Sequence, residues 1–116
     1  MSSITELLSV SNILEILRCP SDSGSEQFFP LVTTPMVTLE KIESYGCITQ
    51  EGYWYDQEDT EWVMLVAGSA TLTFESGGSL SLGAGDYVTL PPHCKHRVDW
   101  CSEDAIWLAL HMRKVS

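Results

Sequence analysis

From Met36 onward, turns that contain glycine or proline recur about every eight to twelve residues and separate short apolar segments. Residues 70–75 alternate polar with apolar side chains, as a half-buried strand does. Tight turns are indicated at residues 67–69 and 76–78, and Pro91-Pro92 ends another strand because proline cannot donate to the backbone ladder. About seven or eight short strands without a long intervening helix predict an all-β fold, an antiparallel sandwich or barrel.

The N-terminal third of the chain has a different pattern. Apolar residues up to Leu17 recur at loosely helical spacing, which predicts one or two short amphipathic helical turns. Residues 19–27 are rich in turn-forming residues and are expected to form a loop. We therefore expect an N-terminal helical and loop extension over residues 1–35 and a barrel over residues 36–116. Within the barrel, the apolar run 62–66 predicts a strand that is buried on both faces or crosses the core.

Composition and charge exclude several classes of function. The chain has 116 residues, enough for one domain, and its net charge is −10, with six Lys and Arg against sixteen Asp and Glu. Such a surface repels phosphate groups, so we expect no binding to nucleic acid or to anionic membranes. No apolar run approaches the roughly 20 residues that span a bilayer. The first residues lack the basic region of a signal peptide, which predicts a cytoplasmic location.

The four cysteines, Cys19, Cys47, Cys94 and Cys101, form no C-x2-C pair. In a reducing compartment we expect all four to be free thiols. Cys94 and His96 would share one face of a strand, but a nucleophilic pair also needs a third group to orient it, and the sequence indicates none.

Two segments combine a potential metal ligand with a glycine turn. In the first, Glu61 precedes Gly68 with six residues between them. In the second, Gly85 is followed by Pro91 and then by His96. Glutamate and histidine are both ligands of divalent metals, so the two segments predict two halves of one site.

These segments resemble the two motifs of the cupin superfamily, over roughly residues 36–112. The second motif, G-x5-P-x-G-x2-H-x3-N, is matched at Gly85, Pro91 and His96, whereas His93 stands at its second glycine and Trp100 at its asparagine. The first motif, G-x5-H-x-H-x3 or 4-E-x6-G, is matched at its glutamate and last glycine, but neither histidine is present. Counting back from Glu61, the histidine positions fall either on Tyr55 and Gln57 or on Trp54 and Asp56.

The resemblance implies a jelly-roll barrel that holds a divalent metal ion, with Zn, Fe, Mn and Ni as candidates. It implies Glu61 and His96 as ligands, with Gln57 or Asp56 as an oxygen donor. Loss of two imidazoles should weaken the affinity and favour harder ions. Each residue also has a structural alternative. Glu61 could be a buried carboxylate held by backbone amides or Arg97, His96 could be structural, and the acidic loop 56–60 could be solvated surface.

Aromatic residues are frequent around the first motif. We expect Trp54 or Tyr55 to line a small-molecule pocket at the mouth of the barrel, and His93 and His111 are further candidates. This hypothesis fails if the rings of Trp54 and Tyr55 pack against the outer sheet. Trp62 and Trp107 are expected in the core, as aromatics at strand spacing usually are.

The resulting hypothesis is a small single-domain cupin that binds a divalent metal and binds or transforms a small organic molecule. Across the superfamily the resemblance allows dioxygenase, isomerase or lyase activity, and the sequence does not choose among them. The alternative is a non-catalytic binding or sensing module that has lost its metal. A third option is a structural subunit of a larger assembly. We also expect a homodimer that pairs through an exposed edge strand at residues 36–43.

Overall fold

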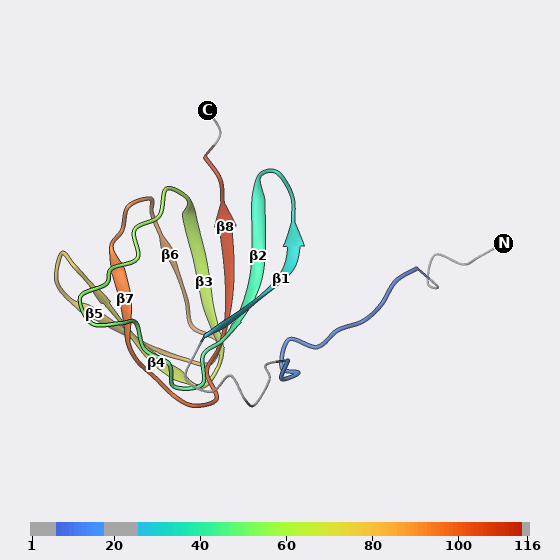
Figure 1. Ribbon diagram of the computed structural model, residues 1–116, viewed down its shortest axis with the longest axis horizontal. Helices are drawn as coiled ribbons and strands as arrows, with labels where there is room; N and C mark the ends of the chain where they lie inside the picture. Colours follow the sequence, from blue (N-terminus) through green and yellow to red (C-terminus); the bar gives the residue numbers. More distant parts are fainter. Residues whose placement is uncertain (1–6, 18–25, 115–116) are drawn as a thin grey trace.

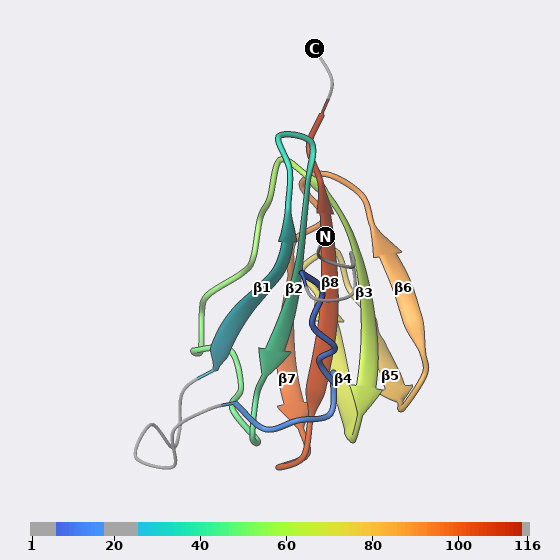
Figure 2. The same ribbon diagram turned by 90° about the vertical axis from the view of Figure 1, so that its right-hand side faces the viewer.

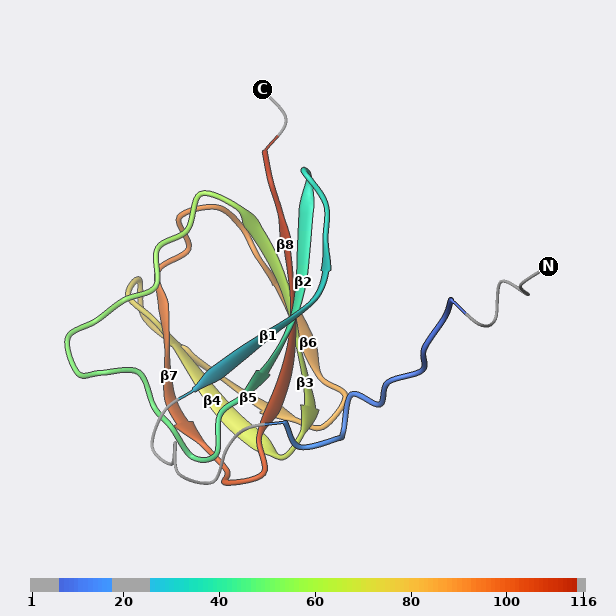
Figure 3. The same ribbon diagram turned by 45° about the vertical axis from the view of Figure 1, so that its right-hand side comes forward.

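The computed structural model describes residues 7–17 and 26–114. In these ranges the chain forms eight strands in two antiparallel sheets, which face each other across a core (Figures 1 and 3). One sheet has the order β1 (Gln27–Thr33), β2 (Val37–Glu43), β8 (Ile106–Met112), β3 (Thr60–Ala67) and β6 (Tyr87–Leu90). The other has the order β5 (Ser79–Gly83), β4 (Ser69–Phe74) and β7 (His96–Cys101). The all-β jelly-roll prediction is confirmed.

The core lies between the sheets and takes alternate residues from each strand. In β3 the buried residues are Glu61, Val63 and Leu65, whereas their neighbours are only half-buried. Of the two alternatives for residues 62–66, burial on both faces is therefore wrong, because only one face of this strand meets the second sheet. Trp107 is buried in the core as expected, but Trp62 lies on the opposite face of β3, where its ring packs against Tyr87 at 5.4 Å.

The glycine after β3 permits a tight turn into β4. Gly68 has a φ of +84°, in the left-handed region that favours glycine. A Cβ atom there would lie 2.3 Å from the Ser102 hydroxyl oxygen, which itself accepts a hydrogen bond from the Ser69 amide at 2.9 Å. The turn thus brings β4 against the loop that joins β7 and β8.

Residues 7–17 contain one turn and no helix, in contrast to the helical turns expected there. The Glu15 amide donates to the Asn12 carbonyl at 3.0 Å, and the rest of the segment extends away from the barrel (Figure 1). Leu7 is 82% exposed and Val10 is fully exposed, so the apolar residues have no surface on which to bury a helical face. Residues 1–6 and most of the loop expected at 19–27 lie outside the described residues.

The end of this N-terminal segment binds to the outer face of β2, where it forms hydrogen bonds with a buried ion pair. Lys41 and Glu43 lie 3.0 Å apart, and their side chains are 1% and 0% exposed. The Lys41 ammonium donates to the Glu15 carbonyl, and the Leu17 amide donates to the Glu43 carboxylate at 2.9 Å. Both charged groups therefore have partners in a part of the sheet that water does not reach.

β2 is an interior strand, so the prediction of an exposed edge at residues 36–43 is wrong. It pairs with β8 on one side and with β1 on the other, as Figure 2 shows. β1 forms the edge of the sheet, and it begins at Gln27, before the expected start of the barrel at Met36.

Two other sequence expectations concern cysteines and membranes. Cys47, Cys94 and Cys101 form no disulfide with one another, in agreement with the expected thiols, and Cys19 lies outside the described residues. Within the ranges that the structure covers, no helix is long and apolar enough to cross a membrane.

Candidate functional site

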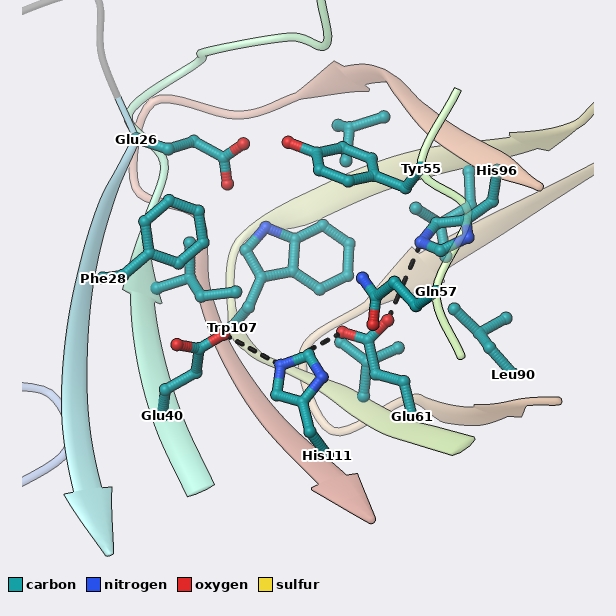
Figure 4. A pocket seen from close by; sticks show the side chains of 14 residues that line it. Glu26, Phe28, Glu40, Tyr55, Gln57, Glu61, Leu90, His96, Trp107 and His111 are labelled. Carbon is teal, nitrogen blue, oxygen red and sulfur yellow. Dashed lines mark hydrogen bonds and ion pairs between the residues drawn. The ribbon is translucent and has the colours of Figure 1, made fainter. Parts of the chain in front are cut away.

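A pocket opens between the two sheets and has about 550 Å³ of empty space, including its mouth. One part of its wall is apolar and the other carries carboxylate, imidazole, amide and phenol groups (Figure 4). The polar or charged lining residues are Glu26, Glu40, Tyr55, Gln57, Glu61, His96 and His111. The apolar lining includes Phe28, Ile42, Val63, Leu72, Leu90, Val98 and Trp107. This composition, apolar with a few convergent polar groups, is typical of a small-molecule site.

The two sequence-predicted ligands face each other in this pocket. Glu61 comes from β3 and His96 from the start of β7, so the opposed sheets bring them together. The Glu61 Oε1 atom lies 3.7 Å from the His96 Nε2 atom, and both side chains are 10% exposed. A separation of 3.7 Å is too long for a hydrogen bond. The Oε1 atom of Glu61 is buried and has no hydrogen-bond partner among the described residues.

A backbone contact fixes the orientation of the His96 ring. Its Nδ1 atom lies 2.8 Å from the Cys94 carbonyl oxygen, which can only accept a hydrogen bond. The Nδ1 atom therefore carries the proton, and the Nε2 lone pair of the neutral ring is directed towards Glu61. A backbone carbonyl that orients an imidazole in this way is a common outer contact of metal-binding histidines.

His111 joins the same cluster from β8. Its Nε2 atom lies 2.9 Å from Glu40 Oε1 and 4.0 Å from Glu61 Oε2. The hydrogen bond with Glu40 is the main cause that raises the pKa of His111 above 6.5. Burial raises the pKa of Glu61 above 4.5, although His111 and His96 oppose that shift. Both Glu61 and His111 therefore keep their protons to a higher pH in the pocket than they would in water.

The loop before β3 turns one of the two readings of the first motif towards the pocket. Tyr55 and Gln57 line the pocket, which corresponds to the shorter spacing before Glu61. Tyr55 is held there by two backbone hydrogen bonds with His96, at 2.8 and 3.1 Å, and the two rings stack at 5.7 Å. Figure 4 shows the Gln57 side chain directed towards Glu61 and His96.

The other candidates lie outside the pocket. Trp54 does not line it and lies under the Arg97 guanidinium, 5.8 Å from the ring centroid. Asp56 pairs with His93 at 2.8 Å, and these side chains are 40% and 64% exposed. His93 adopts a φ of 60° at the position where the motif has glycine, so it turns the chain there.

Two lining carboxylates, Glu26 and Glu40, were not among the sequence candidates. Glu40 could have been found from its alternation with Ile42, because both point inward from β2. Glu26 precedes β1, and no motif or periodicity in the sequence marks it.

The lining residues fit, in part, the divalent metal ion that the cupin resemblance implies. Within residues 7–17 and 26–114, no three His, Cys, Asp or Glu side chains converge as metal ligands do. The Glu61 and His96 atoms nevertheless fit two ligands of one ion, since ligands about 2.1 Å from a metal lie up to about 4.2 Å apart. Gln57 also lines the pocket, and its amide oxygen could serve as a third donor. The donor set therefore fits a divalent ion that keeps open positions.

The raised carboxyl pKa values predict an unusual pH dependence of metal-free stability. Burial raises the pKa of Glu26 and Glu61 above 4.5, so the folded chain binds more protons than the unfolded chain just above that pH. The free energy of unfolding should therefore fall as the pH rises from 4.5 through the raised values. The stabilisation from His111, complete below 6.5, is lost in the same direction as the pH rises through its raised pKa.

Urea unfolding with a chelator at several pH values between 4.5 and 8 would measure this dependence. Glu26→Gln should flatten the curve, whereas Glu51→Gln, a change at an exposed side chain, should leave it unchanged. A free energy of unfolding that rises with pH across this range would contradict the prediction.

Comparisons with known proteins agree with this fold. The family model described as "Cupin domain" matches residues 49–111. The crystal structure of a putative mannose-6-phosphate isomerase from Ralstonia eutropha JMP134 is 32% identical, with a TM-score of 0.83, and the match covers 92% of this chain and 100% of that one. No curated protein matches the chain significantly.

More distant structures share the fold. A cupin superfamily protein from Desulfitobacterium hafniense DCB-2 is 14% identical with a TM-score of 0.67, over 78% of this chain and 79% of that one. KdgF from Halomonas sp. is 20% identical with a TM-score of 0.67, over 81% and 84% of the two chains. The chain belongs to the cupin domain family.

Proposed function

We propose that this cupin binds a divalent metal ion in the barrel pocket together with a small organic molecule, on which it performs acid–base chemistry. Glu61 and His96 would hold the ion, and Gln57 would complete the protein ligands. The observation that carries the proposal is the buried Glu61 Oε1 atom, which lacks a hydrogen-bond partner and faces the lone pair of an oriented imidazole. A buried carboxylate oxygen without a partner is destabilising unless a bound group satisfies it.

The donor set indicates which ions to expect. One imidazole and two oxygen donors suit Mn, Fe, Ni or Zn, and the reduced number of nitrogen ligands favours the harder ions of this group. When bound, the ion would supply Lewis acidity to an oxygen of the organic molecule.

The Glu40–His111 pair gives the pocket an acid–base group of its own. Glu40 accepts a hydrogen bond from His111, and this contact keeps the imidazole protonated to a higher pH than usual. His111 can therefore hold a proton beside Glu61 and release it to, or recover it from, a bound molecule. Isomerases and lyases both need such proton transfers, and we propose this class of reaction.

A second candidate is a binding or sensing module without a metal. The specific observation in its favour is that Tyr55 and Gln57 occupy the pocket positions of the two motif histidines. In this case the same pocket would hold an organic ligand through hydrogen bonds alone.

Thermal unfolding with added metal tests the proposal. Mn²⁺, Fe²⁺, Ni²⁺ or Zn²⁺ at 100 times its dissociation constant should stabilise the folded chain by about 2.7 kcal/mol. His96→Gln should remove this effect, whereas Asp56→Asn, at an exposed side chain, should retain it. A melting temperature that none of the four ions changes would favour the metal-free module.

We also propose that the protein is a homodimer in the cytoplasm. The exposed apolar side chains of residues 7–17 support an interface with a second copy: Leu7, Leu8, Val10, Leu14, Ile16 and Leu17. Light scattering should give twice the chain mass of 12.9 kDa, and a mass of 12.9 kDa would contradict the dimer.

A further inference from the structure

The pocket has a second polar end, away from Glu61 and His96. The rings of Phe28, Tyr55 and Trp107 surround this end, and the carboxylate of Glu26, the residue before β1, points into it (Figure 4). None of the residues named at this end is among the proposed metal ligands Glu61, His96 and Gln57.

Trp107 brings an unpaired hydrogen-bond donor to this end. The residue is 3% exposed, and its Nε1 atom is buried with no partner among the described residues. An indole N–H group can only donate, and a buried donor without an acceptor is destabilising. A bound molecule that places an oxygen against this N–H group would remove that cost.

Glu26 and Tyr55 supply the complementary groups. The Ser44 hydroxyl donates to Glu26 Oε2 at 3.3 Å, and the carboxylate still has room to accept from a bound molecule. The Tyr55 phenol lines the same end, and a phenol hydroxyl both donates and accepts hydrogen bonds. Tyr55 can therefore donate or accept.

We infer that this end is a hydroxyl-binding subsite and that the pocket takes a small uncharged polyhydroxy molecule. A hydroxyl group accepts from the Trp107 N–H group and donates to the Glu26 carboxylate at the same time. Three aromatic rings provide flat apolar surfaces for the C–H groups of such a molecule. The inference rests on the proposed function only in assigning the opposite end of the pocket to the metal.

Other polar groups fit this end less well. An ammonium group would satisfy Glu26 but leave the Trp107 donor unpaired, because it has no acceptor. A phosphate or carboxylate would accept from Trp107 but meet the Glu26 charge, and no Lys or Arg lines the pocket in the described ranges. Like charges in a partly buried site repel strongly, so the pocket should select against anions.

Calorimetry and saturation-transfer NMR with matched probes test the inference. The uncharged probes are D-mannose, D-glucose and myo-inositol, and the charged ones are D-mannose 6-phosphate and D-mannosamine. We expect at least one uncharged probe to bind, and its phosphorylated or amino counterpart to bind at least tenfold more weakly. Trp107→Phe keeps the ring but removes the N–H donor, and it should weaken binding of the uncharged probe about tenfold. Trp62→Phe, on the outer face, should have no effect.

Glu26→Gln tests the charge separately, because it keeps an acceptor oxygen. It should reduce the discrimination against the phosphorylated probe. Binding of none of the uncharged probes, tighter binding of a charged probe, or unchanged binding in Trp107→Phe would each overturn the inference. Metal content is measured on the same samples. If the protein contains metal but binds no probe, the hydroxyl subsite is refuted and the metal site is not. If metal-free protein binds a probe and this binding depends on Trp107, the metal site is refuted and the hydroxyl subsite is not.

Discussion

Replacing Lys41 with methionine should lower the free energy of unfolding by about 3–5 kcal/mol. The substitution removes the cation from a pair in which neither side chain reaches water, and it leaves the Glu43 carboxylate buried. It also removes the donor to the Glu15 carbonyl, so the N-terminal segment loses one of its contacts with β2. Urea unfolding of the variant and the wild type would measure the difference.

The double variant Lys41→Met/Glu43→Leu is the matched control. Because it removes both charges, it should recover most of the lost stability, as buried ion pairs replaced by apolar residues often do. Lys95→Met breaks a pair whose side chains are about half exposed and should change stability by less than about 1 kcal/mol. If Lys41→Met lowered the free energy of unfolding as little as Lys95→Met does, the Lys41–Glu43 ion pair would not hold the N-terminal segment on the sheet.

Glu61→Leu should raise the stability of the metal-free protein by about 1–3 kcal/mol and abolish its stabilisation by metal. The wild-type side chain buries a carboxylate with one unpaired oxygen, and burial raises its pKa. A leucine of similar volume removes that unfavourable group. A substitution that raises the stability of the metal-free protein but abolishes metal binding identifies a binding residue, because loss of a structural residue would lower the stability.

Chemical unfolding with a chelator and with added metal would measure both effects. Glu61→Gln is the conservative comparison, because it keeps the side-chain shape without the charge. A loss of stability in metal-free Glu61→Leu would show that the carboxylate serves the fold, as the structural alternative for Glu61 holds.

The strands could be predicted because turns and alternating residues are local features of the sequence. Gly68 is an example, since the turn needs a left-handed residue without a side chain. Local patterns misled where the outcome depends on distant partners. The N-terminal segment has the spacing of a helix, but residues 7–17 have no surface on which that helix could pack.

The candidate site was predicted in part for the same reason. Glu61 precedes a recognisable glycine turn and His96 follows another, and the structure brings the two residues together. The choice between Tyr55 with Gln57 and Trp54 with Asp56 depends on which residues of a loop face inward, and spacing alone leaves both open. The contact of His111 with Glu40 depends on the register between β8 and β2, which no local motif encodes.

The most direct measurement of the central claim is the metal content of untagged protein, determined by elemental analysis. The account predicts about one divalent transition-metal ion per chain in the wild type and in Asp56→Ala, whose side chain pairs with His93 outside the pocket. It predicts that Glu61→Ala and His96→Ala lose the ion while remaining folded. Wild-type protein that is metal-free and resists reconstitution, or variants that keep the ion, would contradict the account.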